Sequence, residues 1–205
     1  MKTLNYLFKP VMLFFFLGLT YSCSNENVEQ VKVNPSEFVL KSDLNLTNFS
    51  RLSKKIDNQF RRTKSVDNLL TEEEAKILLD PVLKDGEKIK KDILNSIDSN
   101  TPEYQMYSEL TDKELILLSV ISVANNPTAK AKSHPSLTGK EVLDCILGAI
   151  GIAEAIPNLR ISGLVTAKTG LQILKAVARR YALGYIALAY SIYNFVDCIN
   201  DHRKD

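Results

Sequence analysis

Apolar residues recur at steps of three and four along most of this chain, which is the period of an amphipathic helix. One such face consists of Leu46, Phe49, Leu52, Ile56 and Phe60. Another consists of Val82, Ile89, Ile93 and Ile97. No strand-like alternation flanked by hairpin signals occurs in the sequence. The pattern therefore predicts an all-α fold, a helical bundle.

Three capping boxes indicate where helices begin. In each box a threonine can cap the backbone and a glutamate three positions later can bond back to it. The pairs are Thr71 with Glu74, Thr111 with Glu114, and Thr138 with Glu141. The helix that follows Thr71 meets Pro81, which we expect to break or kink it. The box at Thr111 precedes LILLSVISVA at residues 115–124, a run too short to cross a bilayer and expected to be a buried helix.

Composition divides the mature chain into two parts. Residues 126–139 contain two prolines and mainly small or polar side chains, which indicates a linker. It separates a helical region, 38–125, from a C-terminal three-helix apolar segment, 140–205. We expect the three helices at about 141–156, 165–181 and 184–200. Small residues in the first of them, including Gly148 and Gly151, would allow a neighbouring helix to approach closely.

The N-terminus has the pattern of a secretory signal peptide. Lys2 and Lys9 form its positive region, and the apolar run 11–19 follows. The residues before Cys23 resemble the lipobox of bacterial lipoproteins. Ser22 fits the small residue expected before the cysteine, whereas Thr20 stands where an aliphatic residue is usual.

That resemblance implies a cleaved signal peptide, 1–22, and a diacylglyceryl thioether on Cys23. Polar residues after Cys23 then form a flexible, lipidated tether over residues 23–37. Fatty acyl chains contribute about 0.8 kcal/mol per buried CH₂, so two or three of them would hold the protein stably. The expected location is therefore outside the cytoplasm, lipid-anchored to the cell envelope at the outer membrane.

Cysteine parity agrees with export. The chain contains three cysteines, Cys23, Cys145 and Cys198, and lipidation of the first leaves an even pair for an oxidising compartment. We expect a disulfide between Cys145 and Cys198. The alternative is that both are buried free thiols.

Charge gives no reason to expect a nucleic-acid partner. The chain has 26 basic and 24 acidic residues, and removal of Lys2 and Lys9 with the signal peptide leaves 24 of each. A basic cluster on the first helix is interpreted as a solvated face, the alternative being attraction to anionic headgroups. It comprises Arg51, Lys54, Lys55, Arg61, Arg62 and Lys64.

Nothing in the sequence indicates catalysis. The two histidines, His134 and His202, form no metal-ligand spacing, and neither Cys-x-x-Cys nor Gly-x-Ser-x-Gly occurs. We therefore expect no enzyme activity, no catalytic or metal-binding residues and no cofactor. The expected role is binding or structural, with membrane lipid as one partner through the acylated N-terminus and a protein as another.

A second hypothesis concerns residues 140–205 alone. The expected helix 165–181 is cationic and amphipathic, with Lys168, Lys175, Arg179 and Arg180 as possible membrane-facing residues. In composition and layout this cysteine-bracketed segment loosely resembles helical bacteriocin-type peptides. That resemblance implies a membrane-active module, carried by a lipoprotein precursor, that permeabilises a competitor's membrane.

Overall fold

The predicted all-α fold is confirmed. The computed structural model describes residues 32–62, 70–126, 137–152, 164–180 and 184–202. These residues form seven α-helices and one short 3-10 turn, and their only β pairing is an isolated bridge between Val39 and Thr166. The elements are α2 (Leu46–Arg62), α3 (Glu72–Ser96), α4 (Pro102–Ser108), α5 (Asp112–Ser122), η1 (Val123–Asn125), α6 (Gly139–Ile150), α8 (Ala167–Arg180) and α9 (Tyr185–Asp201).

All three predicted capping boxes are confirmed. In each, the glutamate backbone N–H donates to the threonine hydroxyl and the threonine N–H donates back to the carboxylate. They begin α3, α5 and α6. Sequence analysis did not anticipate the short helix α4, which Thr101 caps and Pro102 opens. Proline is favoured at that position because its missing N–H has no partner inside the helix.

The helix α3 runs through Pro81 without a break, so of the expected break or kink the break does not occur. Proline lacks the N–H that would normally bond to the carbonyl of Ile77, one turn earlier. Ile77 itself is 66% exposed. Leu79 and Val82 are fully buried on the opposite side. Packing of that buried face keeps the helix continuous.

The helix α6 ends earlier than the predicted boundary near residue 156. Gly151 adopts the left-handed conformation, with φ 76° and ψ 24°, and its N–H bonds to the last turn. Glycine tolerates this geometry because it has no Cβ, so it terminates the helix instead of lying inside it. Gly148 also does not serve a close helix contact, because nothing lies within 4 Å of the Cβ it would carry as alanine. Residues 153–156 of the predicted helix lie outside the described residues.

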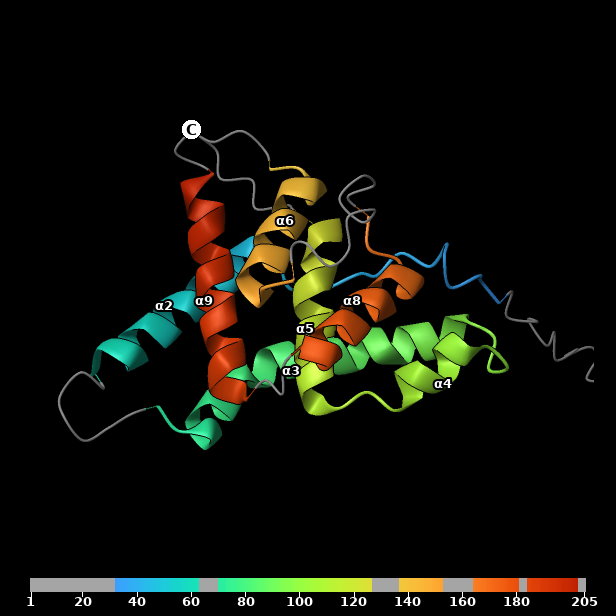
Figure 1. The fold of residues 1–205 in the computed structure, drawn as a ribbon, viewed down its shortest axis with the longest axis horizontal. Coiled ribbons are helices and arrows are strands. Elements are labelled where there is room, and N and C mark those ends of the chain that lie inside the picture. Colours follow the sequence, from blue (N-terminus) through green and yellow to red (C-terminus); the bar gives the residue numbers. More distant parts are fainter. Residues whose placement is uncertain (1–31, 63–69, 127–136, 153–163, 181–183, 203–205) are drawn as a thin grey trace, which may run out of the picture. The chain divides into compact units, whose positions relative to one another are not determined.

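One hydrophobic core includes helices from both parts of the chain. The helix α5 stands centrally, with α3 crossing it, α6 and α9 on one side, and α4 and α8 on the other (Figure 1). Every residue of the run 115–124 is buried. The helix α2 packs on α9 through an edge-to-face contact between Phe49 and Phe195, whose ring centroids are 5.8 Å apart. The C-terminal helices therefore bury their apolar faces against α2, α3 and α5.

The segment before α2 is fastened to the start of α8. The Leu40 N–H donates to the Val165 carbonyl at 3.0 Å, and the Ala167 N–H donates to the Phe38 carbonyl at 2.8 Å. The side-chain amide of Asn125 donates to the carbonyls of Leu40 and Val165, at 2.8 and 2.6 Å. Residues 32–37, the last part of the predicted tether, also bond to the body, as in the 2.8 Å bond from the Val33 N–H to the Ser96 carbonyl.

Candidate functional site

The disulfide between Cys145 and Cys198 is present, as predicted. It joins α6 to α9, with the two Cα atoms 5.7 Å apart, within the range that a disulfide requires. His202 lies beside it, with a ring nitrogen within 4.8 Å of both sulfurs. Metal binding needs thiolates, and these sulfurs are bonded to each other. The group is therefore a covalent cross-link between two neighbouring helices.

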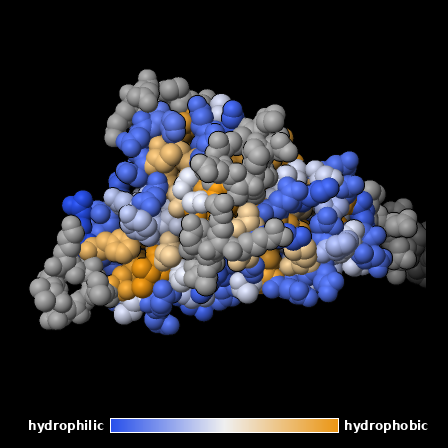
Figure 2. Space-filling view, viewed as in Figure 1, coloured by the Kyte–Doolittle hydropathy of each residue, from blue (hydrophilic) through white to orange (hydrophobic). Residues whose placement is uncertain are grey.

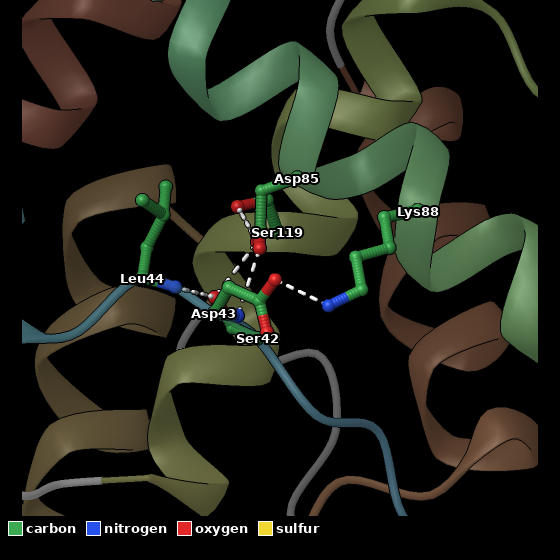
Figure 3. Close-up of polar contacts among 6 residues, drawn as sticks. All are labelled: Ser42, Asp43, Leu44, Asp85, Lys88 and Ser119. Carbon is green, nitrogen blue, oxygen red and sulfur yellow. Dashed lines mark hydrogen bonds and ion pairs between the residues drawn. The ribbon is translucent and has the colours of Figure 1, made fainter.

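A buried carboxylate, Asp85, lies where the segment before α2 meets α3 and α5 (Figure 3). Its carboxylate accepts hydrogen bonds from the Ser42 hydroxyl at 2.7 Å, the Ser119 hydroxyl at 2.6 Å and the Asp43 N–H at 2.8 Å. Asp85 is 6% exposed and Ser119 is fully buried. Burial of a carboxylate is tolerated when several donors converge on it. These donors all come from the chain itself, which makes the cluster a junction between three segments.

An ion pair covers the outer edge of this junction. The ammonium group of Lys88 donates to the carboxylate of Asp43, and both side chains are exposed (Figure 3). The hydrogen bond to Asp43 raises the pKa of Lys88. Exposed pairs of this kind contribute little to stability, about 0–1 kcal/mol. The main contribution of Asp43 to the junction is therefore the hydrogen bond from its backbone N–H to Asp85.

A groove of about 370 Å³ lies between α2 and α3. Its floor is formed by the buried side chains of Phe49 and Val82. Its walls are apolar and partly open to water, and they are formed by Leu44, Leu52, Ile77, Leu78 and Pro81. Concave apolar sites of about 300–1,000 Å³ are typical of small-ligand binding.

The rim of this groove is cationic. Arg51 and Lys55, one turn apart on α2, line it together with Asn48. No acidic side chain belongs to the described lining, and no ion pair of either cation occurs within the described part of the chain. Elsewhere at the same i,i+4 spacing a base faces an acid, as Arg61 faces Asp57 and Lys84 faces Asp80. The groove thus combines an apolar interior with two unopposed positive charges.

Most of the predicted basic residues are exposed. Arg51, Lys54, Lys55 and Arg61 lie on the solvent side of α2, and Lys168 and Lys175 lie on that of α8. In α8, Leu171 and Leu174 belong to the core. The side chains of Arg62, Arg179 and Arg180, and all of Lys64, lie outside the described residues, as do Cys23 and His134.

Aromatic side chains gather beside the end of α2. Phe60 contacts Tyr190 edge to face at 6.3 Å between centroids, and Tyr190 stacks on Tyr193 at the same distance. Tyr190 is 55% exposed. On the face seen in Figure 2, hydrophobic surface lies at the lower left, where α2, α3 and α9 come together in Figure 1. Apolar surface is therefore left open on this side of the molecule.

Comparison of the chain with protein-family models, characterised proteins and solved structures finds no match. Among the described residues, no helix combines the length and the hydropathy needed to cross a bilayer. The groove and its two cations are accordingly the features of the folded body from which a function can be argued. Sequence analysis grouped Arg51 and Lys55 in the basic cluster but did not foresee the groove, because its far wall comes from α3.

Proposed function

We propose that this chain is an exported lipoprotein, anchored to the outer membrane through an acylated Cys23, with a non-catalytic binding role at the cell envelope. The observation that carries the proposal is the cross-link between Cys145 and Cys198. Disulfides persist in oxidising compartments, which are reached by export. Because this bond uses two of the three cysteines, Cys23 is left as the single thiol, at the position the lipobox resemblance assigns for acylation.

The binding role is supported by the groove between α2 and α3. A helical body that served only as a spacer would gain nothing from exposing Ile77 and Pro81 beside two unopposed cations. A binding role accounts for both features, since apolar walls hold a ligand and a few charged groups orient it. The ligand would reach the groove from the aqueous side of the envelope.

Labelling of the protein in cells tests the anchor. Cells that produce the chain are fed radiolabelled palmitate and then fractionated. We expect label and membrane association for the unaltered protein, and loss of both for Cys23→Ala. The matched control is the double variant Cys145→Ala/Cys198→Ala, which should keep its label. Undiminished labelling of Cys23→Ala would rule the proposal out.

A liposome experiment separates this role from the membrane-active alternative. In the folded body the apolar faces of α6, α8 and α9 belong to the core that α5 shares, so they are not free to enter a bilayer. Because that core also needs α2, α3 and α5, we expect residues 139–205 alone, oxidised or reduced, to be unfolded and to cause no dye leakage from anionic liposomes at low peptide-to-lipid ratio. Leakage that disappears on reduction would favour the bacteriocin-like module over a lipoprotein with a binding role.

A further inference from the structure

The groove between α2 and α3 is lined by two positive side chains and, among the described residues, by no acidic one. Arg51 and Lys55 are four residues apart, so their side chains project from the same face of α2. Two like charges at this spacing repel each other and weaken a helix slightly. Elsewhere on these helices a base pairs with an acid, as Arg61 does with Asp57 and Lys84 with Asp80, but neither acid belongs to the described groove lining. An anion bound between Arg51 and Lys55 would remove this repulsion.

The walls favour a hydrocarbon as the rest of the ligand. Leu52 on one side faces Ile77 and Pro81 on the other, and Ile77 is 66% exposed. Covering these side chains with an alkyl chain removes apolar surface from water on both partners. A volume of about 370 Å³ suits a single chain.

We propose that this groove binds a single-chain anionic amphiphile, a free fatty acid, with its carboxylate between Arg51 and Lys55 and its alkyl chain along Leu52, Ile77 and Pro81. Guanidinium and ammonium groups both form charge-assisted hydrogen bonds to carboxylates. The inference rests on the proposed binding role and names the ligand class for it. It does not depend on the anchor, because the groove belongs entirely to the body.

Calorimetric titration of the body with monomeric dodecanoate tests the proposal. Residues 32–205 form one compact unit with a continuous core and provide the sample, with circular dichroism to verify its helix content. We expect saturable one-to-one binding that strengthens about two- to fourfold with each added methylene from octanoate to dodecanoate. Dodecyltrimethylammonium has the same chain and the opposite charge, and it should bind at least tenfold more weakly.

Matched variants locate the site. The double variant Arg51→Gln/Lys55→Gln should weaken dodecanoate binding at least tenfold, whereas Lys54→Gln, a neighbouring exposed cation outside the lining, should change it less than twofold. Ile77→Asp should abolish binding. Its control is Leu164→Asp, a similarly exposed apolar residue elsewhere on the surface.

Two outcomes would overturn the proposal. One is the absence of saturable dodecanoate binding by a folded body. If that body instead sediments with phosphatidylglycerol vesicles, the cations are a contact for a membrane surface. The other is equal affinity in Arg51→Gln/Lys55→Gln. Each would leave palmitate labelling of Cys23 unaffected, so failure of this inference is distinguishable from failure of the proposed anchor.

Discussion

The Cα of Gly86 in α3 faces the backbone carbonyl of Leu115 in α5 so closely that a Cβ on Gly86 would lie 2.0 Å from that oxygen. No side chain other than hydrogen fits there unless one helix moves. Gly86→Ala should therefore destabilise the protein by about 3 kcal/mol, measured by urea denaturation. Gly148→Ala is the matched control, since its site is open and helical. It should stabilise by about 0.5–1 kcal/mol. Similar effects of the two substitutions would contradict this packing.

Removing the buried carboxylate next to Gly86 should also be costly. Asp85→Ala leaves the hydroxyls of Ser42 and Ser119 and the N–H of Asp43 without their acceptor. Each unsatisfied buried group costs about 1–3 kcal/mol, so we expect a loss of several kcal/mol in the free energy of unfolding. Asp85→Asn keeps one acceptor oxygen and should lose less. If both variants denatured at the wild-type urea concentration, the junction would contribute nothing.

Because the phenol of Tyr107 is buried, we expect the free energy of unfolding to fall at high pH. Tyr107 is fully buried and donates to the Ala167 carbonyl at 2.7 Å. Burial, and secondarily Glu103, raises its pKa above the ordinary value of 10.0. The unfolded chain therefore loses the proton first, and the stabilisation is complete below pH 10 and falls as pH rises further. Tyr107→Phe should cost about 1–3 kcal/mol at pH 7. Thermal melts from pH 7 to 11 should show a smaller alkaline decline for this variant than for the wild type.

Because the capping glutamates have lowered pKa values, we expect stability to fall as the pH is lowered. Hydrogen bonds from the backbone and side chain of Thr71 lower the pKa of Glu74, and those of Thr138 do the same for Glu141. A lowered pKa means that the stabilisation is present above the ordinary value of 4.5 and is lost as pH falls below it. Glutamine accepts the same bonds without titrating. Glu74→Gln/Glu141→Gln should therefore flatten the dependence of Tm on pH between 5 and 3. An unchanged slope would show that these caps do not contribute to it.

The disulfide should contribute substantially to stability. Cys145 and Cys198 are separated by 53 residues, and in the chain-entropy model closing a loop of that size stabilises by about 4 kcal/mol. Cys145→Ala/Cys198→Ala should lower the urea midpoint markedly, and a reducing agent should do the same to the wild type. Cys23→Ala is the control and should leave the midpoint unchanged. A midpoint insensitive to reduction would mean that the cross-link adds no stability.

Features that depend on a few consecutive residues could be predicted from sequence. The capping boxes at Thr71, Thr111 and Thr138 are local, because threonine and glutamate meet within a single turn. The apolar periodicity gave the helical class for the same reason. Gly151 also carried a local signal, since glycine is the common residue at a helix C-terminus, but it was interpreted as an interior small residue.

Features that depend on where helices cross could not be predicted in this way. Gly86 lies among charged residues, and nothing near it in sequence indicates that Leu115 approaches from another helix. In the sequence Asp85 is one of several acidic residues of α3, and only the fold brings Ser42 and Ser119 to it. The groove has the same origin, because Arg51 and Ile77 lie on different helices. Only the disulfide, a pairing of distant residues, was anticipated, and the small number of cysteines made that possible.

The fastening of residues 32–40 has a mechanical consequence for an anchored protein. Tension on the N-terminal end of an anchored chain would enter the body at Lys32. It would act first on the bonds from Lys32 and Val33 to the carbonyls of Asn95 and Ser96, and then on those joining Phe38 and Leu40 to the start of α8. These bonds tie the N-terminal segment to both α3 and α8. In the sequence α3 precedes the predicted linker and α8 follows it. If Cys23 is acylated as proposed, a pull on that attachment would be shared between the two parts of the chain before α2 is loaded.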